Sequence, residues 1–397
     1  MAASQPHVAI ACGGTGGHFF PGVAVARALQ QQNVRVTLWV SNKAIDQKAL
    51  ATVPDLAHVS TPAVALEWRR PWRFLFGLRT AMRQVRTAMA DDRPEAVLAM
   101  GGFTSAAPVW VGRKLGAATF LHESNAVPGR ANRLLSRWVD EVLVGMAPAA
   151  ERFGNSHVEV TGTPVRDDFR ELDQRPSREA LGLPSDQPMV LVIGGSQGAR
   201  GVNRLVTAAS TEWRGVSLLH VCGATDEAEV RAAYAGAVNE VQVHAFLKDM
   251  PQALGAATLA VSRAGASSIA ELAAARVPAV FIPLPNSADD HQRANAAAVV
   301  AAAVDAAAPA PGHYSGVRRR RPERCHSRRQ RALLSASRRL RVPTRAAHRL
   351  DRHGDGPGPR EFPVRDADRA LDGAPLAHRR HPGVVVAAIG GPPRARP

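Results

Sequence analysis

One unit occurs twice in this chain and restricts its fold more than any other feature: a short apolar run, a glycine-rich turn and a stretch with helical patterning. The first copy is VAIACGGTGGHFFPGVAVARALQQQ, from Val8, and the second is MVLVIGGSQGARGVNRLV, from Met189. An apolar run without polar alternation is typical of a strand buried on both faces of a parallel sheet. The repeat therefore predicts an α/β protein in which helices connect parallel strands.

Further apolar runs extend each copy into a series of predicted strands. The first series lies at 8–11, 36–40, 96–100, 118–121 and 141–144, and the second at 189–195, 216–221, 241–246, 258–262 and 278–284. Residues 161–188, rich in turn formers and charge, indicate a connection between two domains. We expect two Rossmann-like domains, at 1–163 and 164–305, with parallel sheets that face a cleft and a ligand at the C-terminal ends of their strands.

The first glycine-rich turn, CGGTGGHFFPG, is a candidate phosphate loop. Glycines allow backbone N–H groups to approach a ligand closely, and the N-terminus of the following helix favours an anion. The turn fits neither the dinucleotide pattern, because Phe19 takes the place of the last glycine, nor a Walker A loop, because no lysine follows. We therefore predict a diphosphate here, with an ordinary tight turn as the alternative.

Two loops in the second half offer the same chemistry. Ser196 and Gln197 follow the strand at 189–195 and can donate side-chain hydrogen bonds to phosphate oxygens. In VSRAGASSIAELAAA, Gly265 precedes a predicted helix whose Glu271 lies one turn in. That carboxylate could accept hydrogen bonds from ribose hydroxyls, or it could simply be a favourable acid near a helix N-terminus.

Several ionisable residues are candidates for catalysis. His18 lies close to a predicted helix N-terminus, which disfavours the imidazolium and leaves a neutral ring that can accept a proton. Hydrogen bonding to a phosphate or hydroxyl is the rival role for His18. His122 and Glu123 directly follow a predicted strand. Each could act in catalysis or could simply form buried hydrogen bonds. Arg166, at the domain junction, could hold a charged group.

The positive charge of the chain is concentrated at its end. Residues 306–397 contain 21 arginines, 7 acidic residues and 12 prolines, a net charge of +14, whereas residues 1–305 have a net charge of +2. High charge with few large apolar residues predicts a disordered arm that could bind acidic lipid or RNA. The abrupt change in composition instead favours out-of-frame translation of GC-rich DNA. On either interpretation the tail does not determine the function.

The remaining composition excludes other classes of protein. Three scattered cysteines are too few for a disulfide framework or a zinc site, so we expect a reducing compartment and no metal or cofactor. No basic flank precedes the first apolar run, and no 18 strongly apolar residues follow one another. We expect neither a secreted nor a membrane-spanning protein.

Six motifs together resemble the MurG family of bacterial N-acetylglucosaminyltransferases in peptidoglycan synthesis. They are CGGTGGHFFPG, LHESNAVPGRANR, TGTPVR, GGSQGAR, SRAGASSIAELAAARVPAVFIPLP and DDHQRANA, in order over about residues 7–303. The resemblance implies a GT-B fold, UDP-N-acetylglucosamine as donor and undecaprenyl-diphospho-muramoyl-pentapeptide (lipid I) as acceptor. The implied product is lipid II.

Matching positions imply roles for individual residues. His18 would assist deprotonation of the muramoyl 4-hydroxyl, with Glu123 as the second candidate for catalysis. Attack from the face opposite UDP would invert the anomeric centre, and a helix end would stabilise the departing UDP without a metal. The implied substrate-binding residues are Thr15, Gly16, Gly17, Asn125, Arg166, Ser196, Gln197, Leu247, Ala266, Ser267, Ser268, Ile269, Ala270, Glu271 and Gln292.

The sequence departs from the family at a few places. Ser124 stands where the family often has Gln, Ala264 where it often has Ser, and His291 where it often has Gln. Nothing after about Val304 resembles the family, whose last helix returns to the N-terminal domain. An exposed apolar seam, a looser angle between the domains and impaired activity are the consequences we expect.

The segment 66–86, LEWRRPWRFLFGLRTAMRQVR, interleaves aromatic residues with arginines. Such a pattern suits an interface with anionic lipids, and the alternative is a core helix with a basic edge. The lipid acceptor favours peripheral attachment to the cytoplasmic face of the bacterial plasma membrane, with other cell-wall synthesis proteins as further partners.

Two other functions compete with this prediction. One is another GT-B enzyme that uses a UDP-sugar, either a lipid glycosyltransferase or a UDP-sugar epimerase. The other is a nucleic-acid-binding protein driven by the arginine-rich tail, which predicts steeply salt-dependent binding. Because the sequence has no aromatic RNA-binding motif, we expect no nucleic acid as a partner.

Overall fold

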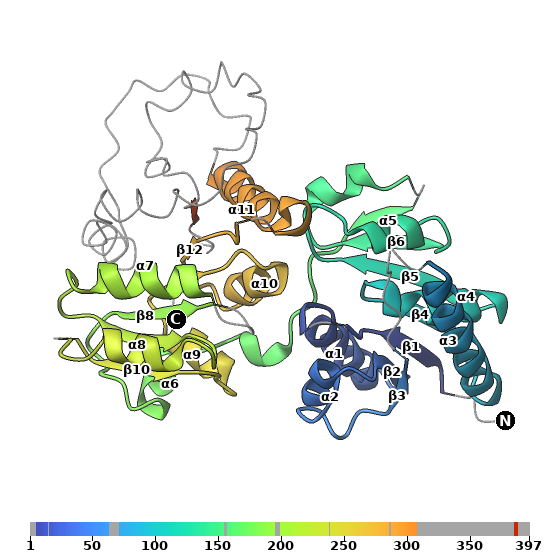
Figure 1. Cartoon of the computed structure of the whole chain (residues 1–397), viewed down its shortest axis with the longest axis horizontal. Helices are drawn as coiled ribbons and strands as arrows, with labels where there is room; N and C mark the ends of the chain where they lie inside the picture. The colour runs from blue at the N-terminus through green and yellow to red at the C-terminus, as the bar shows by residue number, and fades with distance from the viewer. Residues whose placement is uncertain are drawn as a thin grey trace, which may run out of the picture.

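The computed structural model describes residues 5–14, 16–62, 71–154, 157–194, 199–237, 239–285, 287–307 and 385–387. These residues form two lobes, each built on one sheet, with α1 and α10 between them (Figure 1). Among the described helices, none combines the length and the apolar character that crossing a bilayer requires.

The N-terminal lobe has a seven-stranded sheet in the order β3-β2-β1-β4-β5-β6-β7, paired in parallel throughout. In chain order the strands are β1 (His7–Ala11), β2 (Arg35–Ser41), β3 (His58–Thr61), β4 (Ala96–Ala99), β5 (Ala118–Glu123), β6 (Glu141–Val144) and β7 (Val158–Val160). The α-helices are α1 (Gly16–Gln31), α2 (Ala44–Leu50), α3 (Pro71–Asp91), α4 (Ala106–Lys114) and α5 (Arg130–Leu135). Two short 3-10 helices, η1 (Phe103–Ser105) and η2 (Ala147–Arg152), complete the lobe.

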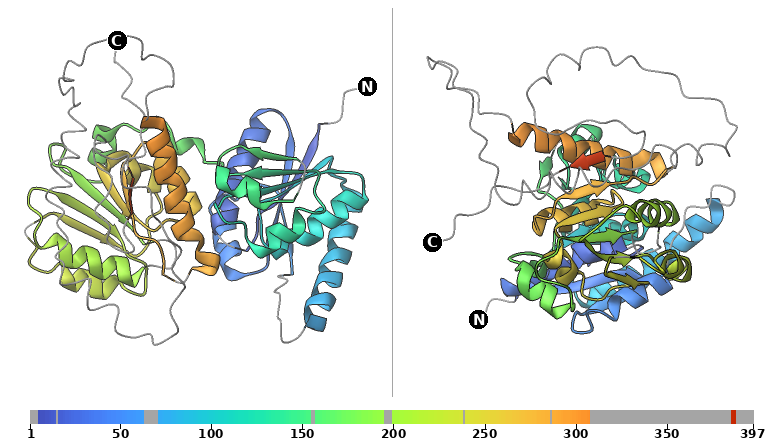
Figure 2. Two further views of the ribbon diagram at one scale, coloured as in Figure 1. Left: turned by 90° about the horizontal axis from the view of Figure 1, so that it is seen from above. Right: turned by 90° about the vertical axis from the view of Figure 1, so that its left-hand side faces the viewer.

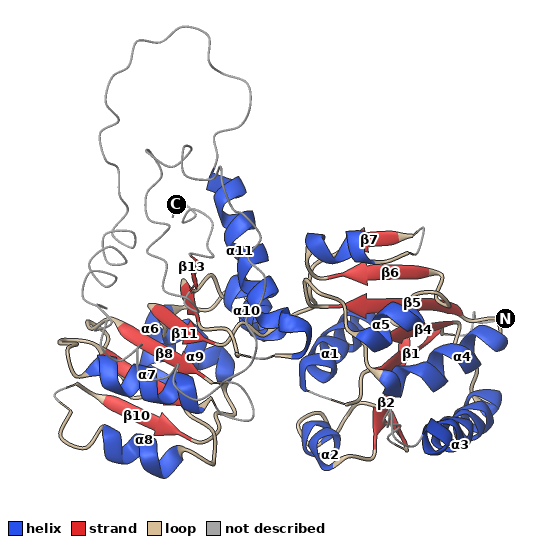
Figure 3. Cartoon of the chain, turned by 45° about the horizontal axis from the view of Figure 1, so that its top comes forward, coloured by secondary structure: helices blue, strands red, loops and turns tan. Residues whose placement is uncertain are grey.

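The C-terminal lobe repeats this arrangement in a six-stranded sheet with the order β10-β9-β8-β11-β12-β13. Its strands are β8 (Met189–Ile193), β9 (Ser217–Val221), β10 (Val241–His244), β11 (Leu259–Ser262), β12 (Ala279–Phe281) and β13 (Val385–Ala387). Its helices are α6 (Gln174–Ala180), α7 (Arg200–Ser210), α8 (Glu227–Ala233), α9 (Met250–Ala256), α10 (Ala266–Ala274) and α11 (His291–Ala307), with the 3-10 helices η3 (Asp167–Phe169) and η4 (Ala288–Asp290). Helices cover both faces of the sheet (Figures 2 and 3).

Both faces of each sheet are covered, which explains the uninterrupted apolar runs. In β1, Ala9 and Ala11 belong to one buried cluster, whereas Ile10 and the following Cys12 belong to another. All five residues of β8 are buried as well. Successive side chains of a strand point to opposite faces, so a strand between two helix layers needs apolar residues at every position.

The structure confirms the predicted α/β, GT-B type of architecture and places a strand at each of the ten predicted runs. It adds three short strands, β3, β7 and β13, that the sequence patterns did not predict. The connection at 161–188 is also more structured than expected, because it contains η3 and α6. The guanidinium of Arg178 in α6 bonds to the carbonyl of Ala256 at 3.1 Å and to the hydroxyl of Thr258 at 2.9 Å, which fastens α6 to the C-terminal lobe.

The predicted disorder of the tail concerns residues that are largely outside the described ones. Within that tail, β13 pairs antiparallel with β12, with Val385 opposite Phe281. Neighbouring parallel strands must be joined by a long crossover connection, whereas an antiparallel strand does not need one. The sheet therefore ends in a strand of opposite direction.

Candidate active site

A buried carboxylate holds the first glycine turn in place through hydrogen bonds. Asp46 in α2 accepts hydrogen bonds from the Gly14 N–H at 2.8 and 3.0 Å, and from the hydroxyl and N–H of Ser41. The Thr104 hydroxyl donates to the Gly13 carbonyl at 2.8 Å. Gly14 has a φ of 111°, a conformation that L side chains rarely adopt, so the turn requires glycine here. The turn is thus shaped by the protein itself.

His18 lies in the first turn of α1 and packs against the turn after β4. A Cβ atom at Gly101 would approach the Nε2 atom of His18 to 3.0 Å, so only glycine leaves room for the ring. Burial lowers the pKa of the His18 imidazole, and the nearby carboxylates of Glu123 and Asp46 oppose this shift without reversing it. The ring is therefore held in surroundings that favour its neutral form.

Glu123 ends β5 and is 3% exposed. Its Oε1 atom accepts from the backbone N–H and the side-chain amide of Asn125, both at 2.9 Å. Its Oε2 atom accepts from the Gly129 N–H at 3.0 Å and from the Asn132 amide at 2.8 Å. Four donors therefore fix this carboxylate, which organises the loop from 124 to 132.

His122, the other ionisable residue at this strand end, is 2% exposed. Its Nε2 atom lies 3.0 Å from the Gly162 carbonyl, and its Nδ1 atom lies 3.4 Å from the Ser124 hydroxyl. Burial lowers the pKa of His122. These contacts favour the buried hydrogen-bonding role over a catalytic one.

The two lobes meet where the first glycine loop faces α10. The Ser267 hydroxyl, in the first turn of α10, donates to the Gly17 carbonyl at 3.2 Å. Gly265 precedes the helix and Ala266 begins it, as the sequence predicted. The N-terminal ends of α1 and α10 are thus brought to one place, and helix N-termini are favourable sites for anions.

Glu271 lies further along α10, on the side of Arg166. Burial raises the pKa of Glu271 to about 7, although the positive charge of Arg166 lowers it. The Arg166 guanidinium stacks over the rings of Phe20 at 5.6 Å and Phe169 at 4.9 Å, and its Nη1 atom lies 3.4 Å from Asp168. A cation is therefore held at the domain junction beside an acid that is easily protonated.

Some of the other predicted substrate-binding residues make contacts within the C-terminal lobe. The Gln292 side chain accepts from the Leu284 N–H at 2.9 Å, and Leu247 packs against the core of the C-terminal lobe. Ser268 is half-buried in α10. Thr15, Ser196 and Gln197 lie outside the described residues, so their predicted roles remain predictions.

A cavity of about 1390 Å³ opens between the lobes. Ala266, Ile269 and Ala270 of α10 line it, together with Gly162 and Thr163 of the junction. Neither His18 nor Glu123 lines it. The cavity therefore lies on the junction side of α10, next to the meeting point of the two helix ends rather than on it.

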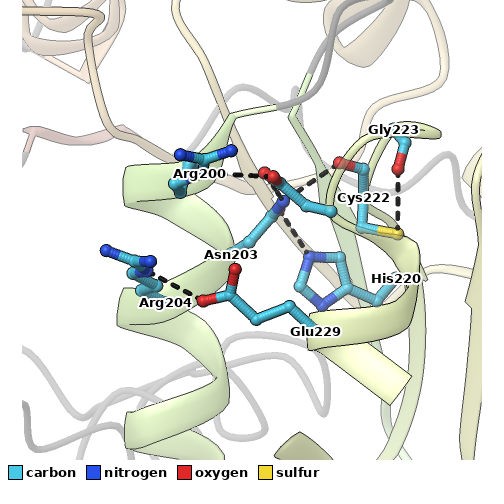
Figure 4. Close-up of polar contacts among 8 residues, drawn as sticks. Arg200, Asn203, Arg204, His220, Cys222, Gly223 and Glu229 are labelled. Atoms are coloured by element: carbon cyan, nitrogen blue, oxygen red, sulfur yellow. Dashed lines mark hydrogen bonds and ion pairs between the residues drawn. The ribbon is translucent and has the colours of Figure 1, made fainter. Parts of the chain in front are cut away.

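The C-terminal lobe contains a polar network that sequence reasoning missed (Figure 4). His220, 0% exposed, lies between the Asn203 amide oxygen at 3.0 Å and the Tyr234 hydroxyl at 2.9 Å. The Asn203 amide donates to Asp226 at 3.0 Å, and Asp226 also accepts from Arg200 at 3.2 Å. Burial lowers the pKa of His220 to about 4. A neutral ring thus anchors the start of α7, directly after the second glycine loop.

Both halves of the chain match known protein families. Residues 8–144 match the glycosyltransferase family 28 N-terminal domain, and residues 189–308 match the glycosyltransferase family 28 C-terminal domain. Together with two facing Rossmann-like lobes and a glycine-rich stretch in the sequence of each, these matches define a GT-B glycosyltransferase of family 28.

Individual relatives narrow this class. One relative is the UDP-N-acetylglucosamine–N-acetylmuramyl-(pentapeptide) pyrophosphoryl-undecaprenol N-acetylglucosamine transferase of Synechococcus sp. (strain JA-3-3Ab). The two sequences are 37% identical over 305 residues, and the alignment covers 75% of this chain and 80% of the relative. The transferase of the same name from Listeria monocytogenes is 35% identical over 304 residues, which covers 74% of this chain and 83% of the relative. The crystal structure of Acinetobacter baumannii MurG superposes with a TM-score of 0.58 at 28% identity and covers 75% of this chain and 84% of that one. The chain belongs to the MurG family, and the resemblance seen in its sequence is confirmed.

Proposed function

We propose that this chain transfers N-acetylglucosamine from UDP-N-acetylglucosamine to the 4-hydroxyl of lipid I, with inversion, and so produces lipid II. The observation that carries the proposal is the contact between Ser267 and Gly17, because it sets the start of α10 against the first glycine loop. A donor diphosphate on α10 and an acceptor diphosphate on α1 would then lie on opposite sides of the reacting atoms. The names of the relatives supply the two substrates.

The donor is assigned to the C-terminal lobe. The N-terminus of α10 would face the UDP diphosphate, where unpaired N–H groups and the helix dipole stabilise negative charge. Glu271 would hold the ribose, and Arg166 would add a positive charge at the junction. The other predicted substrate contacts are Ala266 to Ala270, Leu247, Asn125, Gln292, Gly16 and Gly17, together with Thr15, Ser196 and Gln197 from outside the described residues.

His18 is the proposed general base, supported by its neutral ring and its place in the first turn of α1. A ring nitrogen of His18 would take the proton of the muramoyl 4-hydroxyl while that oxygen attacks the anomeric carbon. The bond from that carbon to the UDP oxygen breaks, and UDP departs with the electron pair toward the α10 N-terminus. Glu123 remains the second candidate, although its four hydrogen bonds favour a supporting role.

We also propose peripheral attachment to the cytoplasmic face of the bacterial plasma membrane through α3, α4 and the end of α5. Exposed apolar side chains occur on each of them: Phe76 is 67% exposed, Trp110 38% and Leu134 41%. Trp110 also packs edge-on against Trp138 at 5.7 Å and lies under the Lys114 ammonium at 5.6 Å. Exposed arginines on α3 add positive charge.

The sequence predicted only part of this proposed surface. Residues 66–70 and the side chains of 71–75 lie outside the described ones, so the prediction for Arg69, Arg70 and Arg73 rests on the sequence. Charge reversal at these three positions should weaken cosedimentation with anionic vesicles. Replacement of Trp110 and Trp138 by serine should do the same, and unchanged cosedimentation in both variants would remove the proposal.

The proposed reaction is tested by a thermal melt and a transfer assay on the full chain. UDP-N-acetylglucosamine should raise the unfolding midpoint and UDP-glucose should not, because selective binding to the native state stabilises it. Radiolabelled N-acetylglucosamine should then appear in lipid only when lipid I is present. Turnover of the donor without lipid I, with an epimerised sugar as product, would support the UDP-sugar epimerase instead.

A further inference from the structure

The two lobes are connected by one buried side chain that none of the predicted roles includes. Asn295 lies in α11 of the C-terminal lobe and is 0% exposed. Its Oδ1 atom accepts from the Ala126 N–H at 2.8 Å, and its Nδ2 atom donates to the Asn125 Oδ1 atom at 3.0 Å. The same Nδ2 atom donates to the Ala264 carbonyl at 3.1 Å, directly before Gly265 and α10. One amide therefore contacts both sides of the cleft.

The contacts continue into the N-terminal lobe. Asn125 donates to the Oε1 atom of Glu123, whose Oε2 atom accepts from the Asn132 amide at 2.8 Å. The Asn132 Oδ1 atom accepts in turn from the Gly102 N–H at 3.1 Å. Gly101 and Gly102 are the residues against which the His18 ring packs. An unbroken chain of side-chain hydrogen bonds thus runs from the start of α10 to the wall behind His18.

Each amide in this chain has one orientation that satisfies its neighbours. A reversed Asn295 amide would turn its NH₂ group toward the Ala126 N–H and its oxygen toward the Ala264 carbonyl. A reversed Asn125 amide would place its oxygen against the Glu123 carboxylate. Buried donors and acceptors that lose their partners are strongly unfavourable, so the chain transmits one arrangement from end to end.

Other described polar contacts between the lobes are weaker. The guanidinium groups of Arg130 and Arg133 approach Asp289 only to 3.7 and 3.5 Å, and these arginine side chains are 70% and 48% exposed. The contact between Ser267 and Gly17 is also exposed. Exposed pairs of this kind contribute little, because water and salt screen them. The buried Asn295 amide is the contact best able to fix the relative position of the two lobes.

We propose that Asn295 is an interdomain positioning residue, which keeps the start of α10 in register with the loop 124–132 and, through it, with His18. The inference rests on the proposed function, because it assumes a donor on α10 and a base at His18. It adds that the alignment of the two substrates depends on a residue that contacts neither reacting group. Donor binding and transfer should therefore respond differently to its removal.

Hydrogen–deuterium exchange on the ligand-free full chain tests the structural part. Asn295→Ala should speed exchange in the peptides that cover 124–132 and 101–105 by about tenfold or more, since a lost hydrogen bond worth about 1.4 kcal/mol corresponds to tenfold. Asn125→Ala cuts the same link from the other lobe, and the two effects should not add. It also provides a second route to the result if the Asn295 variant does not fold.

Two matched variants separate positioning from general loss of stability. Arg293→Ala removes an exposed side chain, 68% accessible, from the same helix two residues away. Val206→Ala removes packing from the core of the C-terminal lobe, where Val206 is 3% exposed. Neither should change exchange in 124–132. Unchanged exchange there in Asn295→Ala, or an equal change in Val206→Ala, would overturn the proposal.

Kinetics test the functional part. Asn295→Ala should reduce kcat by about tenfold to a hundredfold, because misplacement of reacting groups by about 1 Å has effects of that size. The Kd for UDP-N-acetylglucosamine should change by less than about threefold, since the donor contacts on α10 remain. A loss confined to donor affinity, with kcat unchanged, would contradict positioning. If the unsubstituted chain shows no transfer, the proposed function fails, and the exchange result alone decides whether Asn295 connects the lobes.

Discussion

The first five strands of the two lobes share one order, yet the polar networks beside the first β-strand of each lobe differ in chemistry. In the N-terminal lobe two buried carboxylates, Asp46 and Glu123, hold the turn and the loop beside His18. In the C-terminal lobe the buried carboxylate of Asp226 and the neutral ring of His220, both bonded to Asn203, hold the start of α7. On the proposed donor side, burial raises the pKa of Glu271 to about 7, which reduces the negative charge near neutral pH. The network beside His18 therefore relies on carboxylates, whereas the network at the start of α7 combines a carboxylate with a neutral imidazole.

The largest effect should come from His18→Gln, which tests the proton-accepting lobe. Loss of a general base reduces kcat by about 10²- to 10⁴-fold, while affinity for UDP-N-acetylglucosamine should change little. In the unsubstituted chain the acid limb of the kcat profile should fall below the ordinary histidine value of about 6.5, because burial lowers the pKa of His18. Steady-state rates between pH 5 and 9 measure both. His220→Gln is the control from the other lobe, and an acid limb that survives in His18→Gln would assign the base elsewhere.

A second pair of variants compares the buried acids. Glu123→Gln turns an NH₂ group toward two donors and should lower the free energy of unfolding by about 2–3 kcal/mol. Asp226 accepts from two donors, Asn203 and Arg200, and the Arg200 side chain is 59% exposed. Asp226→Asn should therefore lower the free energy of unfolding by only about 1 kcal/mol. Urea unfolding of both variants measures the difference. Equal losses would mean that the lobes do not differ in their dependence on buried charge.

The pH dependence of the free energy of unfolding should also distinguish the lobes. His220 has a pKa of about 4 in the folded chain and about 6.5 when unfolded, so between these values the unfolded chain binds the additional proton. The free energy of unfolding therefore falls as the pH drops from about 6.5 to 4, by up to about 3 kcal/mol from this residue. Hydrogen exchange of β9 at pH 7 and pH 5 follows the loss. His220→Gln should flatten the dependence, and an unchanged slope would count against a neutral His220.

The smallest effects should come from exposed ion pairs, equally in both lobes. Arg35 pairs with Asp92 in the N-terminal lobe, and Arg204 pairs with Glu229 at 2.9 Å in the C-terminal lobe, with side chains between 45% and 60% exposed. Arg35→Ala and Arg204→Ala should each lower the free energy of unfolding by no more than about 1 kcal/mol. A larger loss in one lobe would show that surface charge contributes to the contrast between them.

Much of the fold could be predicted because its signals are local. Apolar runs and glycine turns indicated the ten strands and the starts of α1 and α10, whereas β3 and β7 are short edge strands that lack such runs. The partners of Glu123 and Asn295 could not be predicted in this way. Asn295 meets Asn125 across 170 residues, and its role depends on how the two lobes are placed. Asp46 gave no pattern either, since a single acid in a short helix is common.

The fastening of α6 to the C-terminal lobe by Arg178 has a mechanical consequence. With α6 attached, the described part of the chain passes from one lobe to the other in the short segment between β7 and η3. Asn295 on α11 provides a second attachment between the lobes, which is made by hydrogen bonds. Two attachment points define a line, so rotation about that line is the relative movement of the lobes that these two attachments restrain least.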